Sequence, residues 1–132
     1  MLRHPWRTLF PALAIAVSAA ACSEDPTKPA NRNPVIYSVI AFPSTLGPLD
    51  STIVICNAAD PDGTTPVYDW ITDPRLRIRG APPNATSKYN TTDNSQVFYP
   101  GVDTPNDTAW VQCFVRDGIG GSTEQTVLII VA

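Results

Sequence analysis

The side chains that most often do catalytic chemistry are scarce in this sequence. Its single histidine, His4, lies among the first residues, so the rest of the chain has no imidazole that could act as a general base or complete a Ser–His–Asp arrangement. There is no glycine-rich phosphate-binding loop and no zinc-ligand cluster. Carboxylates remain, but most aspartates stand beside proline or glycine, where turns form. These residues predict a protein that is not an enzyme and needs no cofactor.

The one metal site that the residue types suggest is a calcium site. The stretch DPDG supplies Asp60 and Asp62 at alternate positions, and Asp117 begins a second turn. Calcium takes about six to eight oxygen ligands, so two or three carboxylates fall short of a full shell. Asp-Pro-Asp-Gly is also good turn chemistry, because proline fixes one backbone angle and glycine adopts a positive one. The turn interpretation is therefore favoured over the calcium site.

Residues 1–21 have the composition of a secretory signal peptide. Arg3, His4 and Arg7 form a cationic start, an apolar stretch follows, and the last few residues are small. A membrane-spanning helix needs about 20 apolar residues. The apolar stretch here is shorter and contains Pro11 near its beginning. The sequence therefore predicts that this segment directs export.

The small residues end directly at Cys22, which Ser23 follows. The run Ala19 to Cys22 resembles the lipobox of bacterial lipoproteins, with alanine at the position where leucine is usual. The resemblance implies that residues 1–21 are removed and that Cys22 carries acyl chains, which anchor a protein in a membrane. Serine after the cysteine resembles the pattern sent to the outer membrane. Residues 22–33, polar and rich in proline, are then a flexible tether, and the expected location is the bacterial cell envelope.

Two further cysteines, Cys56 and Cys113, complete the three in the chain. In an exported protein they lie in an oxidising compartment, where a disulfide between them is expected. In a reducing cytosol they would instead be buried thiols. A bridge that closes so long a loop stabilises the fold by roughly 4 kcal/mol in the chain-entropy model. Export therefore predicts one structural disulfide.

Residues 34–132 alternate between short apolar runs and turn sequences. Runs such as STIVICNA and DTAWVQCFVRD are separated by DPDG, by GIGG and by a long polar stretch, GAPPNATSKYNTTDN. No segment shows the periodicity of an amphipathic helix. About seven short antiparallel strands are expected, which favours an all-β sandwich of two sheets. In RLRIR, Arg75, Arg77 and Arg79 alternate, which is typical of an edge strand protected from pairing with other chains.

A cysteine on the second strand, Trp70 on the third and a cysteine on the sixth form the arrangement of immunoglobulin-like domains. CNAADPDGTTPVYDW and VRDGIGGSTEQTVLIIV resemble regions of bacterial immunoglobulin-like domains of the PKD and cadherin-like type. DTAWVQC resembles the sixth-strand motif of immunoglobulin domains, with Val111 in place of its tyrosine. The resemblance covers residues 34–132 and implies a single immunoglobulin-like sandwich whose Cys56–Cys113 disulfide joins the two sheets. In cadherin-like relatives, aspartates in such loops bind calcium.

Side chains alternate along a strand, so the cysteines and the tryptophan fix which residues face the core. The expected core residues are Val54, Tyr68, Trp70, Val111 and Val115. The residues between them face outward, and the third and sixth strands are neighbours in this fold, so an apolar patch is expected. This interaction face consists of Val67, Ile71, Trp110 and Phe114. Exposed aromatic patches tend to mark interfaces, and the alternative is that the polar stretch or the tether covers this one.

The net charge is −3, from nine basic and twelve acidic residues, and no basic stripe is present, so nucleic acid is not expected as a partner. The expected function is that of a non-enzymatic envelope lipoprotein that acts as a protein-binding or structural module. Its partner would be another envelope protein, a second copy or a glycan. The alternative is a carbohydrate-binding module, in which Trp110 and the Asn- and Thr-rich stretch share one site and exposed aromatics stack on sugar rings.

Overall fold

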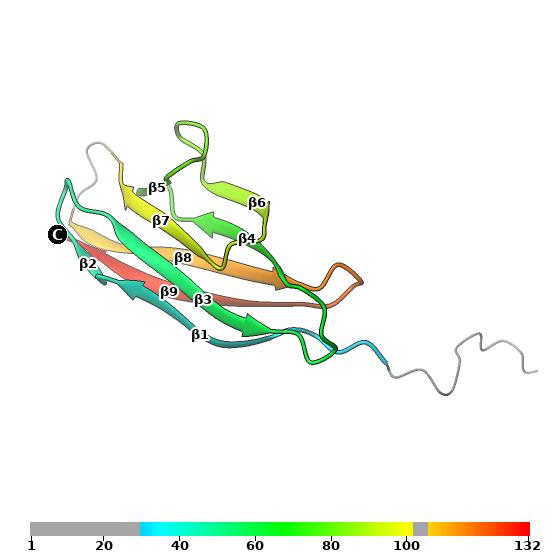
Figure 1. The fold of residues 1–132 in the computed structure, drawn as a ribbon. Coiled ribbons are helices and arrows are strands. Elements are labelled where there is room, and N and C mark those ends of the chain that lie inside the picture. The colour runs from blue at the N-terminus through cyan, green and yellow to red at the C-terminus, as the bar shows by residue number, and fades with distance from the viewer. Residues whose placement is uncertain (1–29, 102–105) are drawn as a thin grey trace, which may run out of the picture. The chain divides into compact units, whose positions relative to one another are not determined.

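The computed structural model describes residues 30–101 and 106–132 of the chain. Every regular element in those ranges is a β-strand, and the strands form two sheets (Figure 1). The all-β class expected from the sequence is therefore confirmed. Residues from Asn31 to Ala132 form one compact unit. The expected signal peptide and the expected acylation site, Cys22, lie outside the described residues.

The two sheets have four and five strands. The four-stranded sheet has the order β1-β3-β7-β5, and its strands are β1 Val35–Phe42, β3 Thr52–Ala59, β7 Ser95–Pro100 and β5 Leu76–Ile78. The five-stranded sheet has the order β2-β9-β8-β4-β6, and its strands are β2 Thr45–Leu46, β9 Ser122–Val131, β8 Asp107–Arg116, β4 Val67–Thr72 and β6 Ser87–Thr91. Strand β5, which contains Arg77, is an edge strand, as the alternating arginines predict.

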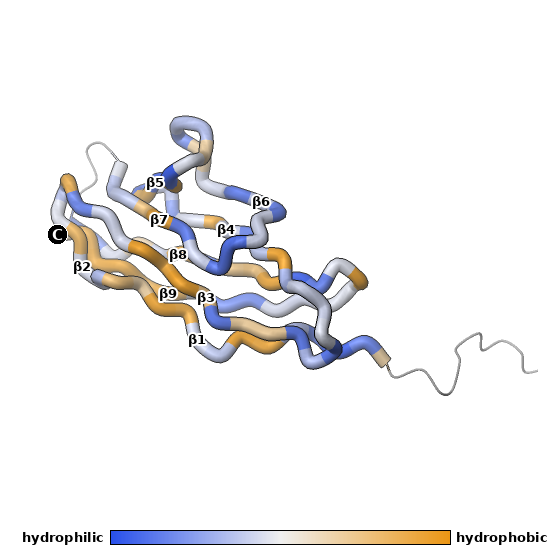
Figure 2. Tube along the Cα trace, viewed as in Figure 1, coloured by the Kyte–Doolittle hydropathy of each residue, from blue (hydrophilic) through white to orange (hydrophobic). Residues whose placement is uncertain are grey.

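The core lies between the two sheets because each strand turns alternate side chains inward. On β8 this alternation is regular: Val111, Cys113 and Val115 are fully buried, and the residues between them are only half-buried. Trp70 of β4 and Phe98 of β7 lie at the centre, with ring centroids 6.0 Å apart. Apolar residues follow the strands and polar residues fill most connections (Figure 2). The two inner faces thus interdigitate as in other sandwiches.

The described residues form nine strands, whereas the sequence predicted about seven. Strand β6 lies inside the polar stretch that was expected to be a loop, and it pairs with β4 so that Lys88 stands opposite Trp70. None of its residues is buried, so its side chains carry no apolar alternation, although its backbone groups pair with β4. Strand β2 has two residues, too few for a periodic pattern. It runs parallel to β9, so the expectation of only antiparallel strands is wrong there.

One end of the sandwich, which we call the entry end, gathers three segments that are distant in sequence. Asn31 and Arg32, at the start of the compact unit, contact the turn 60–63 between β3 and β4 and the turn 117–121 between β8 and β9. In the second turn Gly118 and Gly120 have φ values of 80° and 103°, which other residues rarely adopt. The C-terminus lies at the opposite end (Figure 1).

Candidate functional site

Cys56 and Cys113 reach the centre of the core from opposite sheets. Cys56 lies on β3, Cys113 lies on β8 opposite Trp70 of β4, and all three side chains are fully buried. The two sulfur groups are within hydrogen-bonding contact, and that contact together with burial raises the pKa of Cys113 well above its usual value. Both cysteines are free thiols in the structure. The disulfide between them stays a prediction.

The other residues expected in the core lie on the inner faces of the sheets. Val54, Val111 and Val115 are fully buried, and Tyr68 is 5% exposed. Burial raises the pKa of the Tyr68 hydroxyl above its usual range. The cysteines fix which side chains of their strands face inward, so these residues are buried as packing residues of the core.

The residues expected to form an interaction face share the outer side of the five-stranded sheet. The β4–β8 register places Val67 opposite Arg116 and Ile71 opposite Gln112. Side chains two residues apart along a strand project on the same side, so β8 places Trp110, Gln112 and Phe114 on one face. All four expected residues are half-buried, whereas the sequence suggested a freely exposed patch. Their own sheet shields part of each side chain.

Two residues of β9 that were not expected from the sequence extend this surface. Leu128 stands opposite Trp110 in the β8–β9 register and is 61% exposed, and Ile130 stands opposite Thr108 and is 51% exposed. The signal was present in the sequence, because the last strand ends in an uninterrupted apolar run, VLIIV, which leaves apolar side chains on both faces. We call the surface formed by Val67, Ile71, Trp110, Phe114, Leu128 and Ile130 the Trp110 face.

An ion pair borders the Trp110 face. The Arg116 Nε donates to Asp69 Oδ2 at 2.6 Å, and Arg116 also donates to Asn90 Oδ1 at 2.6 Å. The backbone N–H of Asn90 donates to Asp69 Oδ1 at 2.8 Å. Burial by itself raises the pKa of Asp69, but the hydrogen bonds from Arg116 and Asn90 outweigh it and lower the pKa. Asp69 points outward from β4 and is nevertheless only 8% exposed, because these partners cover it.

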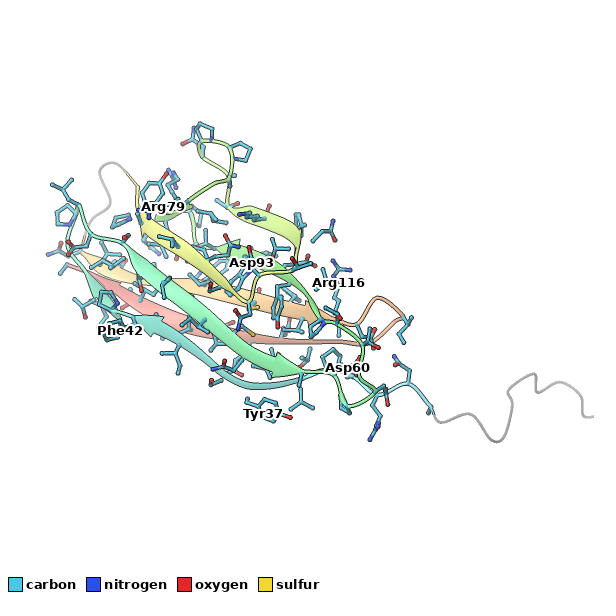
Figure 3. All side chains as sticks on the ribbon, viewed as in Figure 1. Tyr37, Phe42, Asp60, Arg79, Asp93 and Arg116 are labelled. Carbon is cyan, nitrogen blue, oxygen red and sulfur yellow. The ribbon has the colours of Figure 1, made fainter. Side chains whose placement is uncertain are left out.

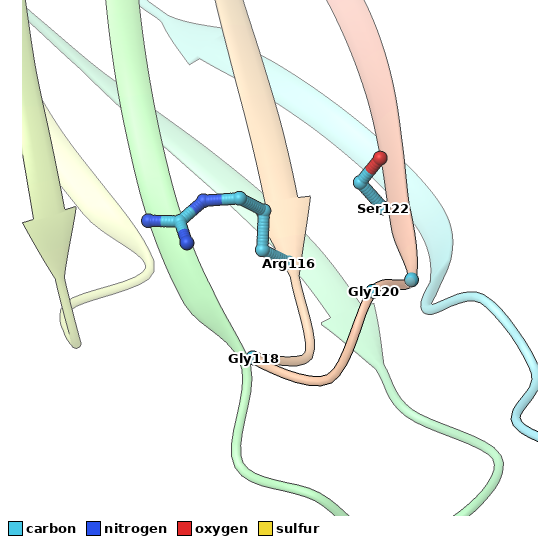
Figure 4. A pocket seen from close by; sticks show the side chains of 5 residues that line it. Arg116, Gly118, Gly120 and Ser122 are labelled. Atoms are coloured by element: carbon cyan, nitrogen blue, oxygen red, sulfur yellow. The ribbon is translucent and has the colours of Figure 1, made fainter.

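Residues around the β8–β9 turn line a shallow pocket of about 290 Å³. Its lining residues are Arg116, Gly118, Gly120, Gly121 and Ser122 (Figure 4). The guanidinium of Arg116 is already bound by Asp69 and Asn90, and three of the other lining residues are glycines without side chains. The arrangement offers Ser122 alone as a side-chain nucleophile, without a base among its lining partners.

The aspartates considered for calcium lie at the entry end and are engaged in turns or ion pairs. Asp62 accepts hydrogen bonds from the backbone N–H and the Nε of Arg32, and these bonds lower the pKa of Asp62. Asp117 Oδ1 accepts from the backbone N–H groups of Ile119 and Gly121 at 2.8 Å each, which lowers the pKa of Asp117. Asp117 Oδ2 accepts from the side-chain amide of Asn31.

Asp60 is buried, as Asp117 is, but one of its carboxylate oxygens is unpaired. Its Oδ1 accepts from the backbone N–H of Asp62 at 3.0 Å, whereas its Oδ2 has no hydrogen-bond partner. Within residues 30–101 and 106–132, no three carboxylate, histidine or cysteine side chains are grouped so that they could hold a metal ion. Asp60 and Asp117 therefore accept hydrogen bonds within their turns and Asp62 pairs with Arg32, and the calcium site stays the less favoured alternative.

A second apolar surface, not expected from the sequence, covers the outer side of the four-stranded sheet. Phe42 is 77% exposed at the end of β1 and points away from the sandwich (Figure 3). We call this surface the Phe42 face, and its residues are Ile40, Phe42, Ile53, Ile55, Val97 and Tyr99. The runs SVIAF and STIVIC are apolar at nearly every position, so each predicts apolar side chains on both faces of its strand.

No family model and no curated protein matches this chain. In the part of the chain that the structure describes, no helix is long and apolar enough to cross a membrane.

Proposed function

We propose that this chain is a non-enzymatic lipoprotein of the bacterial cell envelope, anchored in the outer membrane through acylated Cys22. Its sandwich is an immunoglobulin-like domain of the PKD and cadherin-like type, closed by a Cys56–Cys113 disulfide, and it works as a protein-binding module. The observation that carries the binding role is the Trp110 face, an apolar outer surface on a sheet whose other outer residues are mostly polar or charged.

The strand order supports the immunoglobulin-like type. Immunoglobulin sandwiches pair an A-B-E-D sheet with a G-F-C sheet, and variable-type domains extend the second sheet beyond strand C. The order β1-β3-β7 corresponds to A-B-E and the order β9-β8-β4 corresponds to G-F-C. Strands β5 and β6 lie in the places of D and C′, but β5 precedes β6 in the chain, whereas D follows C′ in that fold. Cys56 on β3, Cys113 on β8 and Trp70 on β4 then occupy the strands that hold the bridge and the tryptophan in that fold.

The composition of the Trp110 face supports protein recognition. Leu128 and Ile130 offer exposed aliphatic surface, and the half-buried Trp110 stands opposite Leu128 in the β8–β9 register. Tryptophan surrounded by apolar neighbours is the composition of binding hot spots. The polar Gln112 and Glu124, which contact each other, lie among these residues and provide hydrogen-bonding groups for a partner.

The test is a capture experiment with the full chain as the source organism produces it. Tagged wild type is compared with Leu128→Glu on the Trp110 face and with Phe42→Glu on the opposite sheet, because both replaced side chains are exposed and neither variant opens the core. One envelope protein should be retained by wild type and by Phe42→Glu, and its recovery should fall at least tenfold with Leu128→Glu.

Retention of the same protein by all three forms contradicts a binding role for the Trp110 face. Binding to a glycan array, lost when Trp110→Ala is introduced and unaffected by Phe42→Glu, would instead support the carbohydrate-binding alternative. Thermal melting of each variant checks that the fold is kept.

A further inference from the structure

The outer side of the four-stranded sheet has an apolar centre and a cationic edge. The β1–β3 and β3–β7 registers place Phe42, Ile53 and Val97 in one row across three strands. The backbone N–H of Arg79 donates to the carbonyl oxygen of Val97, so Arg79 completes the row beside β5. Phe42 and Arg79 therefore lie at opposite edges of this sheet (Figure 3). Phe42 is 77% exposed, and Arg79 is exposed as well.

The cationic edge is formed by Arg77 and Arg79, and we call it the arginine edge. Leu76 and Ile78 of β5 are buried, so alternation turns the two arginines to the outer side of the sheet. Within residues 30–101 and 106–132, neither guanidinium is paired with a carboxylate. The strands β1, β3, β5 and β7 contain no acidic residue. The charges of this sheet therefore favour an anionic partner.

The Phe42 face offers few hydrogen-bonding groups to a protein. The next outward row along β1 and β3 is the polar pair Ser38 and Asn57, and the Asn57 side-chain amide already donates to Ser38 Oγ. A protein interface carries about one hydrogen bond per 100–200 Å². A second copy of this sheet would also bring no carboxylate to the arginine edge. A lipid surface needs no hydrogen bonds in its acyl region and supplies anionic headgroups around it.

The residue types across the sheet suit the boundary between acyl chains and headgroups. Phe42 and Ile53 provide exposed apolar side chains for the acyl region. Tyr99 is 39% exposed and stands opposite Arg77, and tyrosine is enriched at the level of the headgroups. Arginine extends its aliphatic part along apolar surface and keeps its charged group in the polar layer. The arginine edge is thus placed to reach lipid phosphates while the apolar centre contacts acyl chains.

The length of chain before the sandwich keeps this sheet near the membrane that holds the proposed anchor. Asn31, where the compact unit begins, is nine positions after Cys22, which an extended chain spans in about 30 Å at most. Strand β3 has eight residues and is therefore about 25 Å long. A tether of this length lets the sheet lie flat on the bilayer. It also holds the sheet there at an effective concentration of about a millimolar, so that a weak affinity for lipid suffices.

We propose that the Phe42 face and the arginine edge dock on the surface of the anchoring membrane, so that the four-stranded sheet lies against lipid. The inference rests on the proposed anchor at Cys22 and does not use the Trp110 face. Because the two faces lie on opposite sheets, the docked sandwich turns its Trp110 face away from the bilayer and toward partners.

A spin label tests the docking in the full chain, purified from the membranes of the source organism and returned to vesicles that contain anionic phospholipid. The label is attached at Ile40→Cys, a 52% exposed position of the Phe42 face, or at Thr126→Cys on the outer side of the five-stranded sheet as the matched control. Cys56 and Cys113 are fully buried and stay unlabelled. The ratio of collisions with oxygen to collisions with a water-soluble nickel chelate should be roughly tenfold higher at residue 40, because oxygen concentrates in lipid.

Phe42→Glu, introduced beside the label at residue 40, should lower that ratio to the value of the control. A carboxylate in the acyl region lacks hydrogen-bonding partners, so the docked state becomes unfavourable. The replaced side chain is 77% exposed, and an unchanged melting temperature checks that the fold is kept.

The arginine edge is tested by the double variant Arg77→Gln and Arg79→Gln. Each cation near an anionic lipid surface strengthens binding about fivefold, so the ratio of docked to undocked chains should fall roughly twentyfold on anionic vesicles. On vesicles of neutral phospholipid the double variant should match wild type. An equal loss on both kinds of vesicle would overturn the electrostatic part of the proposal.

Three results overturn the docking itself. The first is a label at residue 40 that is as accessible to nickel as the label at residue 126. The second is a label at residue 40 that is shielded from both oxygen and nickel, since a protein would then cover the face. The third is a label at residue 126 that lies in lipid instead. Flotation separates these results from a failure of the anchor: a chain that does not float with vesicles lacks the anchor and overturns both proposals, whereas a floating chain with an aqueous label overturns only this one.

Discussion

Asp69 and Arg116 show, at the scale of single residues, how an outward-pointing charge becomes buried. Alternation on β4 turns Asp69 away from the core, yet it is only 8% exposed because Arg116 and Asn90 close over it. The carboxylate therefore depends on these partners for the hydrogen bonds that water would otherwise supply. An ion pair of this kind orders the side chains at the border of the Trp110 face.

Replacing Arg116→Met should lower the free energy of unfolding by about 1–2 kcal/mol. Removing the guanidinium leaves the Asp69 carboxylate buried without its cation. The expected loss of stability is small because the Arg116 side chain is 37% exposed, so solvent already screens the pair. Chemical denaturation at pH 7 measures the change. The double variant with Asp69→Asn should recover most of it, since an amide carries no charge that needs compensation, and a double variant as unstable as Arg116→Met would contradict this account.

The same pair predicts a pH dependence. The folded-state pKa of Asp69 is lowered, so its contribution is complete above the unfolded value of about 3.9 and is lost as the pH falls through the lower folded value. Between pH 5 and pH 2, wild type should therefore lose more stability than Asp69→Asn.

At the scale of elements, the turns at the entry end hold their strands through carboxylate–backbone hydrogen bonds. Asp117 accepts from two backbone N–H groups of its own turn, and Asp60 accepts from the backbone N–H of Asp62. Asn31 and Arg32 attach the start of the compact unit to both turns. The boundary expected at residue 34 is thus preceded by residues that already contact the sandwich.

These engagements predict that calcium leaves stability unchanged. Asp62 is paired with Arg32 and Asp117 with backbone N–H groups, so a cation would have to displace existing partners. The melting temperature in EDTA should equal that in millimolar calcium. A melting temperature that is higher in calcium for wild type, but not for Asp60→Asn, would establish a calcium site instead. Asp60 is chosen because one of its carboxylate oxygens is unpaired.

At the scale of the whole molecule, a thin sandwich with apolar side chains on both outer faces has more apolar surface than one core requires. Leu128 and Phe42 lie on opposite sheets and are both well exposed. In the proposed arrangement the anchor holds the chain at the membrane, and the Trp110 face remains available to partners.

Replacing Cys22→Ser tests the anchor at this scale. The wild-type chain should fractionate with membranes and enter the detergent phase, because acyl chains on the cysteine partition into the bilayer. The serine variant should appear in the soluble envelope fraction with an unchanged melting temperature. Membrane association that persists in the variant would contradict lipidation at this residue.

The sequence by itself determined the all-β class and the inward residues of the central strands. Trp70, Val54 and Val111 were predictable because alternation is a local property: once one side chain faces inward, its neighbours two residues away do too. The apolar runs at the end of the chain and in β1 also predict apolar side chains on both outer faces of the sandwich, although the sequence prediction included only one of these faces. By contrast, the polar residues of β6 carry no such pattern.

Only the tertiary structure decided which strands are neighbours, and with that the surfaces and the pairings. Phe42 meets Ile53 and Val97 through registers between segments far apart in the chain, and Leu128 reaches Trp110 in the same way. The parallel β2–β9 pair and the Asp69–Arg116 ion pair likewise join distant residues. Alternation tells each strand which side chains turn inward. Backbone hydrogen bonds alone allow many pairings, so the neighbour and the register of each strand are selected by the packing of the inward faces and by the turns, which involve segments far apart in the chain.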